Sequence, residues 1–280
     1  GGAAVLWSTG GALVRFIDGA DSWTIIFLRS ASAAAVLLVY MAFAFRDRLW
    51  PAFMAAGWPG VLVGLCFASS SICMVIALGL TSVANVLIIV STMPLIAAIF
   101  GRIFLGERIG PITYLAIGAV IAGIGLMASG TTDGVSLLGS LFALGMAASY
   151  AGAIVVGRRY PQVEMMPGAF LGAAFALIIS AFIATPVPVS AHDLTIMILF
   201  GAGQLGVAMA LFVTGVRLIP AAQAALVATL EPILGPVWVW LAFGEQPGPR
   251  VIIGGLIVLA AVTAKTLLVQ RHAIAEPPAV

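Results

Sequence analysis

Residues 220–246 read PAAQAALVATLEPILGPVWVWLAFGEQ, and Glu231 is the one charged residue between Pro220 and Phe243. A helix needs roughly 20 apolar residues to cross a hydrocarbon core of about 30 Å, so this stretch is long enough to span a membrane. A carboxylate near its middle costs on the order of a few kcal/mol to insert, so Glu231 should face other helices and have a partner or a task. Pro232 removes a backbone hydrogen bond at the same depth and should bend the helix.

The same pattern occurs earlier in the chain, where residues 82–107 read SVANVLIIVSTMPLIAAIFGRIFLGE. A single constant offset, the one that carries Glu107 onto Glu245, aligns the two stretches without a gap. The aligned pairs are Ala84 with Ala222, Asn85 with Gln223, Pro94 with Pro232, Gly106–Glu107 with Gly244–Glu245, and Pro111 with Pro249. Two unrelated apolar helices would rarely keep such a register. The chain is therefore interpreted as an internal duplication.

The composition indicates a membrane protein. Hydrophobic residues make up 62% of the chain and charged residues 8%, with a mean hydropathy of +1.21, whereas soluble domains are about 25% charged. The net charge of +2 gives no indication of a nucleic-acid partner. The expected surroundings are a lipid bilayer.

Ten membrane spans are predicted, five in each repeat. Since five is an odd number, the second repeat should be inverted relative to the first, which usually places a substrate site between the halves. The predicted fold is an all-α polytopic membrane protein with two inverted five-helix repeats around a central cavity. The repeats are residues 1–130 and 131–270, and residues 271–280 are a tail. The spans are about 2–17, 22–45, 58–79, 82–105, 110–129, 136–157, 166–185, 193–214, 220–243 and 248–269.

The basic residues predict the orientation. With the N-terminus in the cytoplasm, nine of them lie on the inner side and two on the outer side, in agreement with the positive-inside rule. Both termini are therefore expected in the cytoplasm, and the membrane is expected to be a bacterial inner membrane. The inner residues are Arg46, Arg48, Arg102, Arg108, Arg158, Arg159, Arg217, Lys265 and Arg271, and the outer residues are Arg15 and Arg250.

Enzymatic chemistry is not expected from the motifs. Residues 201–206 spell GxGxxG, the dinucleotide fingerprint, but they lie inside an apolar span without the strand that this motif needs. The glycines instead indicate a close helix crossing, with Gln204 facing the interior or a neighbouring carbonyl. His192 falls in a loop and His272 in the tail. We predict no catalytic residue, no metal ligand and no cofactor.

Few polar side chains are expected at membrane depth. The predicted depths of Arg29 and Glu231 differ by only about 5–7 Å, from a helical rise of about 1.5 Å per residue, so we expect them to interact, directly or through water. Such a pair either fixes the packing or binds substrate or a proton. Pro94 and Pro232 are candidate hinges. The candidate substrate-binding residues are Trp7, Ser8, Arg29, Ser70, Ser91, Thr92, Tyr150, Gln204 and Glu231.

For each of these polar residues taken alone, an ordinary hydrogen bond between helices is the more common explanation. Four other aromatic residues lie nearer span ends or faces, and most of them are expected to be membrane-interface anchors. These are Trp58, Trp238, Trp240 and Tyr114.

The paired motifs resemble the EamA-type drug/metabolite transporter superfamily. The resemblance rests on ten spans in two repeats, an arginine in the second span, Met93-Pro94 with Gly106-Glu107, and Glu231-Pro232 with Gly244-Glu245. It covers essentially the whole chain and implies a basket-like bundle with a cavity lined by spans 1, 3, 4, 6, 8 and 9. Known members include exporters of amino acids, one of them an exporter of aromatic amino acids.

This chain departs from a symmetric pattern at one position, because Met93 stands where the second repeat has Glu231. A charge-dependent step is therefore expected in the second half alone. Nucleotide-sugar carriers would need several deep cations, and Arg29 is the one expected here.

The predicted function is export of amino acids or similar small metabolites by alternating access. The alternatives are a drug or quaternary-cation exporter and a membrane scaffold that transports nothing. The expected partners are a small-molecule substrate and the bilayer, and a monomer is taken as the working state.

Overall fold

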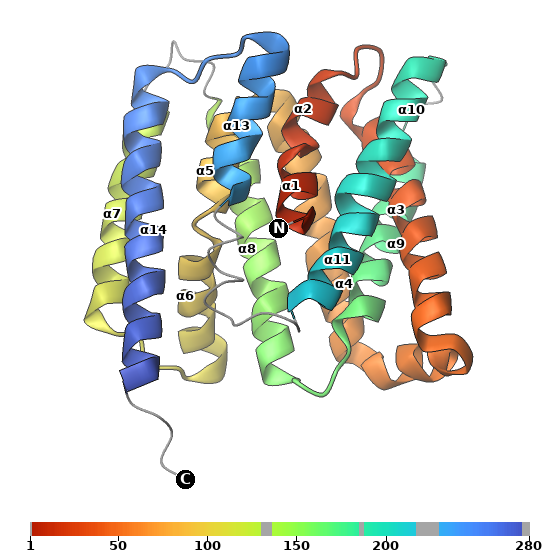
Figure 1. The fold of residues 1–280 in the computed structure, drawn as a ribbon, viewed down its shortest axis with the longest axis horizontal. Helices are drawn as coiled ribbons and strands as arrows, with labels where there is room; N and C mark the ends of the chain where they lie inside the picture. Colours follow the sequence, from red (N-terminus) through yellow and green to blue (C-terminus); the bar gives the residue numbers. More distant parts are fainter. Residues whose placement is uncertain (1, 130–135, 185–187, 217–229, 276–280) are drawn as a thin grey trace.

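The computed structural model describes residues 2–129, 136–184, 188–216 and 230–275, and these residues form helices and connecting segments without a strand. The helices stand side by side, and their connections gather at the two ends of the bundle (Figure 1). They are α1 (Gly2–Ser8), α2 (Gly10–Arg15), α3 (Ser22–Phe45), η1 (Arg46–Arg48), α4 (Leu49–Leu80), α5 (Val83–Val90), α6 (Met93–Leu105), α7 (Pro111–Ala128), α8 (Leu137–Arg159), α9 (Met165–Ile183), α10 (Ala191–Leu199), η2 (Phe200–Val207), α11 (Ala208–Val216), α13 (Leu230–Phe243) and α14 (Pro249–Ala275).

The prediction of apolar membrane helices is confirmed at a coarse level. Among the described residues, six helical stretches are long and apolar enough to cross a membrane, and two shorter apolar helices accompany them. One of the six runs from Ser22 to Leu80 and contains two of the predicted spans. The predicted ninth span, 220–243, falls partly outside the described residues, so the count of ten stays a prediction.

Two helix boundaries differ from the prediction. The third span was expected from residue 58, but α4 already begins at Leu49, and the chain bends at Gly57, where φ is 49° and ψ is −151°. Glycine tolerates this positive φ because it has no Cβ. The last helix, α14, continues to Ala275, past the expected end at residue 269.

The repeated Gly-Glu and Pro positions form the same kind of turn in both halves. Gly106 ends α6 with φ 70°, and Gly244 follows α13 with φ 66°. This left-handed conformation at a helix C-terminus favours glycine. Pro111 and Pro249 are the first residues of α7 and α14, a position where the missing N–H costs nothing. The constant offset between the two stretches therefore reflects a shared turn geometry.

Two of the apolar helical stretches are interrupted within their length. Thr9 separates α1 from α2, and Ser91 and Thr92 separate α5 from α6. The hydroxyl groups at these breaks donate to carbonyls of their own chain, with Thr9 Oγ1 2.7 Å from the oxygen of Leu6. Side chains that bond back in this way compete with regular helix hydrogen bonding and favour a bend.

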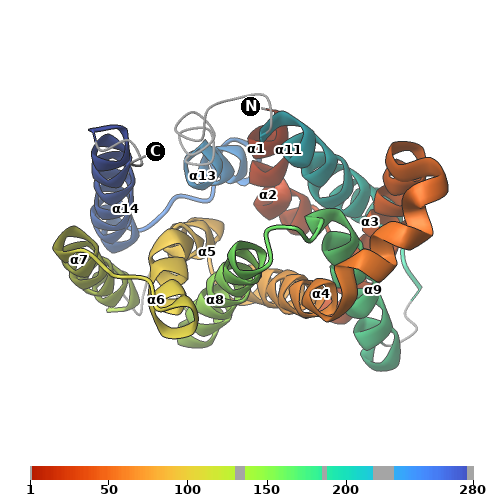
Figure 2. The same ribbon diagram turned by 90° about the horizontal axis from the view of Figure 1, so that it is seen from below.

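The two halves of the chain interlock (Figure 2). Helix α8, from the second half, packs against α4, α5 and α6 from the first half. Seen along the helices, α7 and α14 form a pair at one side of the bundle, and α3, α4 and α9 pack together at the opposite side. Helices α1 and α2 both contact α13, so each half contributes walls to the same interior.

The predicted close helix crossing at the glycine-rich segment is confirmed. A Cβ atom at Gly201 would collide with the carbonyl oxygen of Arg29 and with Ser32 Oγ on α3. A Cβ at Gly206 would lie 2.8 Å from side-chain atoms of Val36, which is also on α3. Small residues permit such close approach in lipid, where dispersion contacts and hydrogen bonds hold helices together.

We expect Gly201→Ala to lower the melting temperature in detergent, because the added methyl group must push α3 and η2 apart. Overpacking of this kind typically costs about 1–3 kcal/mol. Gly203→Ala is the matched control, since a Cβ there meets no heavy atom of the described structure within 4 Å. Equal melting temperatures for the two variants would contradict the crossing.

Candidate functional site

Arg29 on α3 lies in the centre of a buried polar cluster. Its side chain is almost completely buried, with 1% of the residue surface exposed. Nη1 donates to Ser71 Oγ on α4, and Nη2 donates to Gln204 Oε1 on η2 at 3.0 Å. The Phe200 ring covers the guanidinium at 4.4 Å from its centroid. Three segments of the chain therefore meet at one cation.

The charge of Arg29 is compensated by dipoles and a ring. Among the described residues no carboxylate forms an ion pair with it, and Nε has no hydrogen-bond partner there. An isolated charge at this depth is costly, and a cation–π contact offsets part of that cost when the cation is desolvated. The cluster thus holds a deep positive charge with one donor unused.

Gln204 connects Arg29 to the first helix. Its Nε2 donates to the carbonyl oxygen of Trp7 at 3.3 Å, while its Oε1 accepts from Arg29. It lies in η2, a stretch of wider π-helix turns. Such turns shift the facing of the residues that follow and often occur at functional sites. Gln204 was predicted to face either the interior or a neighbouring carbonyl, and it does both, because it bonds to Arg29 and to the carbonyl of Trp7.

Ser8 and Trp7 connect the first helix to two helices of the second half. Trp238 on α13 donates from Nε1 to Ser8 Oγ at 2.9 Å. The Trp7 ring packs against Phe212 on α11, with centroids 5.1 Å apart. Most of four aromatic residues were expected to be interface anchors; Trp238, one of the four, instead bonds inside the bundle through its polar atom. Hydrogen bonds and backbone continuity thus lead from Arg29 through Gln204 and α1 to α13.

Glu231 lies on the inward face of α13. It is partly buried and shares a helix face with Gly235 and Trp238, at i+4 and i+7. Gly235 packs against Leu87 and the carbonyl of Ser8, which places this face toward α1 and α5. Tyr150 on α8, another predicted site residue, packs edge-on against Phe67 on α4, with ring centroids 5.3 Å apart.

We predicted that Arg29 and Glu231 interact directly or through water, and the direct form of this contact is not present among the described residues. Within the described part of the chain, no hydrogen bond or salt bridge joins them. The physical reason is the packing order: α3 contacts α4, α9, α10 and η2, whereas α13 contacts α1, α2 and α5. Similar depth did not bring the two side chains together.

The remaining predicted site residues have mainly structural bonds. Ser70 Oγ donates to the carbonyl of Met146 at 3.2 Å and so ties α4 to α8. Ser91 and Thr92 donate to carbonyls in the last turn of α5, at 2.6 and 2.7 Å. Pro94 is the second residue of α6, directly after the break. Pro232 is the third residue of α13, and the residues before Leu230 lie outside the described structure.

Sequence reasoning missed Phe200 and did not single out Met74, whose sulfur lies 3.8 Å from Arg29 Nη2. It also did not single out Ser71 as the serine that binds Arg29. The spacing of Glu231, Gly235 and Trp238 on one helix face was a signal that could have placed Trp238 inside.

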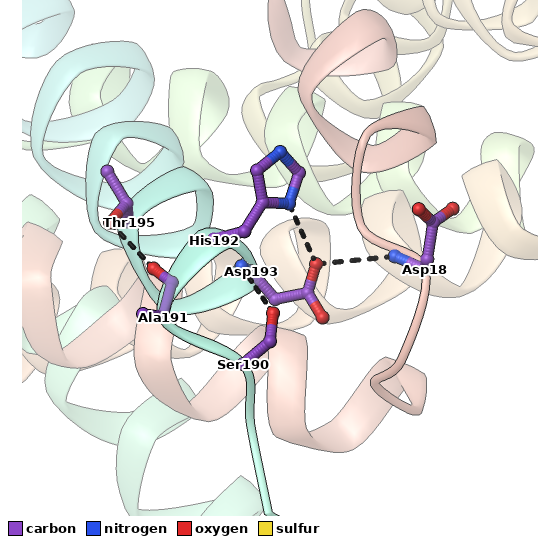
Figure 3. A network of polar contacts seen from close by, with 6 residues as sticks. All are labelled: Asp18, Ser190, Ala191, His192, Asp193 and Thr195. Carbon is purple, nitrogen blue, oxygen red and sulfur yellow. Dashed lines mark hydrogen bonds and ion pairs between the residues drawn. The ribbon is translucent and has the colours of Figure 1, made fainter.

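A second polar cluster lies at the end of the bundle where α2 joins α3 (Figure 3). Asp193 Oδ1 accepts from the backbone N–H of Asp18 at 3.5 Å and lies 3.4 Å from His192 Nδ1. Ser190 Oγ accepts from the backbone N–H of Asp193 as a helix cap. In the described structure no hydrogen bond joins Ser190 to His192, so the group anchors a loop and caps α10 and does not form a hydrolytic triad. His192, expected in a loop, is the second residue of α10.

These features define a helical membrane protein whose interior holds a few isolated polar groups. The model of the EamA-like transporter family matches residues 2–129 and again 137–265. The chain therefore belongs to the EamA-like transporter family and carries its characteristic unit twice.

The search of curated proteins found no match. Among 22 matching solved chains, one described as "Crystal structure of protein" has a TM-score of 0.64 and 20% identity, over 96% of this chain and 95% of that chain. At this identity the likeness concerns the fold alone.

Double-mutant cycles should separate the contacts of Arg29. We expect Arg29→Met and Gln204→Leu to couple by about 0.5–3 kcal/mol, as contacting residues do. Arg29→Met and Glu231→Gln should instead be additive within about 0.5 kcal/mol. Unfolding of the single and double variants in detergent gives both values. Strong coupling in the second cycle would restore the direct pair.

Proposed function

We propose that the protein is a secondary transporter of the bacterial inner membrane that exports amino acids or similar small metabolites by alternating access. Family membership supports a membrane transporter of the drug/metabolite type. The substrate class, the direction and the mechanism are our proposal. The resemblance to the family's aromatic amino-acid exporter remains part of it.

The proposal includes ten spans in two inverted repeats, residues 1–130 and 131–270, with residues 271–280 as a tail. The two matched family ranges and the shared glycine turns support the repeats. The turn between α6 and α7 lies at the lower end of the bundle in Figure 1, and the turn between α13 and α14 lies at the upper end. Equivalent turns at opposite ends are what an inverted repeat requires.

The proposed orientation places the lower end of Figure 1 in the cytoplasm. Arg46 and Arg48 belong to η1 between α3 and α4, and Arg158 and Arg159 end α8; both connections lie at that end. The positive-inside rule favours such a side for the cytoplasm. Both termini are then cytoplasmic.

The observation that carries the substrate proposal is a pair of separated interior charges that do not meet each other. Arg29 is held by dipoles without a described carboxylate partner, and Glu231 is partly buried on the face of α13 that Gly235 directs toward α1 and α5. An amino acid brings one carboxylate and one ammonium group, and so offers a counter-charge to each. Trp7 and Tyr150 supply apolar walls of the kind that ligand sites use. Prolines 94 and 232 are proposed as hinges.

A second candidate, export of organic cations, is favoured by a difference between the two charges. Arg29 is enclosed by Phe200 and already donates three contacts, whereas Glu231 remains partly exposed. A partly exposed carboxylate can pair with an organic cation, and aromatic rings recognise quaternary ammonium groups by cation–π contact. Such a substrate would need Glu231 and not Arg29.

The topology predicts that single cysteines at Gly110 and Gly248 differ in labelling. In intact cells, with Cys66 and Cys73 replaced by alanine, an impermeant maleimide should react at position 248 and not at position 110. The physical reason is that the two turns face opposite compartments. Labelling of both positions, or of neither, would refute the inverted repeat.

We expect Glu231→Gln to keep the fold, because its shape is nearly unchanged, and to lower transport by about tenfold or more, since a buried charged contact is worth roughly 1.5–3 kcal/mol. The measurement is efflux of radiolabelled amino acids and of a quaternary ammonium compound from proteoliposomes with equal amounts of folded protein. Asp47→Asn is the matched control, because Asp47 is exposed on η1.

The substrates in this assay separate the alternatives. A site that accepts both amino acids and organic cations would be indicated by two results together. Glu231→Gln would lose efflux of both kinds of compound, and replacement of Arg29 would lose efflux of amino acids alone. Wild-type rates in a folded Glu231→Gln protein would remove Glu231 from the site. No efflux of any compound by the wild-type protein would favour the scaffold.

A further inference from the structure

Two ion pairs join the halves of the chain at opposite ends of the bundle. At one end Arg15 Nε lies 3.1 Å from Glu245 Oε2, and at the other Arg158 Nη1 lies 3.1 Å from Glu107 Oε2. Arg15 ends α2 and Glu245 follows α13, while Arg158 is near the end of α8 and Glu107 follows α6. Figure 1 places the α2–α13 contact at the upper end and the α6–α8 contact at the lower end.

The two pairs are built from corresponding elements of the repeat, and their glutamates occupy matched positions. Glu107 and Glu245 are matched by the constant offset of the duplication, and each directly follows the left-handed glycine of its turn. Arg15 is the last residue of α2, and Arg158 is the last but one residue of α8. Each pair therefore takes its arginine from the first span of one half and its glutamate from the fourth span of the other.

Neighbouring groups fix each pair in place. Arg15 Nη2 also donates to the carbonyl oxygen of Thr81 at 3.2 Å, which ties the pair to the connection between α4 and α5. At the other end the carboxylate of Glu107 rests against Gly101, where an added Cβ would collide with Oε2. The carboxylate of Glu107 is thus held over the end of α6, and that of Glu245 is bound by an arginine that is itself tied to the first half.

We propose that these pairs are two equivalent latches, each of which holds one face of the transporter closed. The inference rests on the proposed function, because a latch of this kind matters only if the two faces open in turn. To open the upper face, α13 must separate from α2, and this movement breaks Arg15–Glu245 while leaving Arg158–Glu107 intact. The lower face opens by the equivalent separation of α6 from α8.

The strength of the contacts suits reversible use. The side chains of the upper pair are 31% and 29% exposed, and those of the lower pair 46% and 42%. Ion pairs this accessible to water are weak and can exchange their partners for water. Removing one pair should therefore shift the balance between the two open states without preventing either.

The test measures accessibility at both faces of the same protein. In a background with Cys66 and Cys73 replaced by alanine, reporter cysteines replace Val239 on α13 or Ala97 on α6, which are 2% and 1% exposed. Glu245→Gln should raise the maleimide labelling rate at position 239 by roughly two- to fivefold and lower it at position 97. Glu107→Gln should produce the reverse pattern, and the charge swap Arg15→Glu with Glu245→Arg should restore wild-type rates.

Matched controls use arginines at the same faces that are outside the latches. Arg250 donates to the carbonyl of Ser129 at 2.6 Å, and Arg159 stacks over Tyr160 at 5.7 Å. Arg250→Gln and Arg159→Gln should leave both labelling rates unchanged. Equal effects of these controls, parallel changes at both reporters, or no change in either glutamate variant would overturn the proposal.

The readout separates this inference from the proposed function. Labelling requires no substrate, so reciprocal changes in a protein that exports nothing would refute the transport proposal and retain the latches. Normal efflux with unchanged labelling would refute the latches alone. The melting temperatures of all variants, together with the charge swap, show whether a changed labelling rate reflects unfolding.

Discussion

The arrangement of this molecule depends on how a buried guanidinium is accommodated away from water. Arg29 has no described carboxylate partner, and its hydrogen bonds go to a serine on α4 and an amide on η2. Each of these acceptors must lie at the depth of the guanidinium and point toward it. The π-helical turns of η2 place Gln204 there, and the glycines beside it let η2 approach α3 closely enough. The packing of three segments therefore follows from one charge.

A second constraint is that the chain must leave the membrane and return at each end without exposing backbone groups in lipid. The Gly-Glu turn with its following proline satisfies this requirement twice. Left-handed glycines end α6 and α13, and proline begins α7 and α14. The glutamate of each turn is then free to reach the opposite half, as both ion pairs do. One local solution provides both the turn and the contact between halves.

The sequence predicted the positions of helices and turns well, because apolar length and glycine–proline spacing are local properties. Gly106 and Gly244 lie where the repeat places them, and Gly201 marks a crossing as expected. The pairing of Arg29 with Glu231 could not be predicted reliably. Counting the helical rise along each span gives depth, but not the direction in which a side chain points or which helices are neighbours. The π-helix adds a change of register that no apolar pattern reveals.

The charges in the interior of the bundle differ in character from those at its ends. At the ends, Arg15 and Arg158 lie where water reaches them, and each has a carboxylate partner. In the interior, Arg29 is surrounded by neutral groups, and among the described residues Glu231 forms no ion pair. A charge in a low-dielectric interior gains far more from a counter-charge than one at the surface. On the proposed function, a ligand that supplies that counter-charge is therefore recognised in the interior, while the exposed pairs are weak enough to break as the faces open.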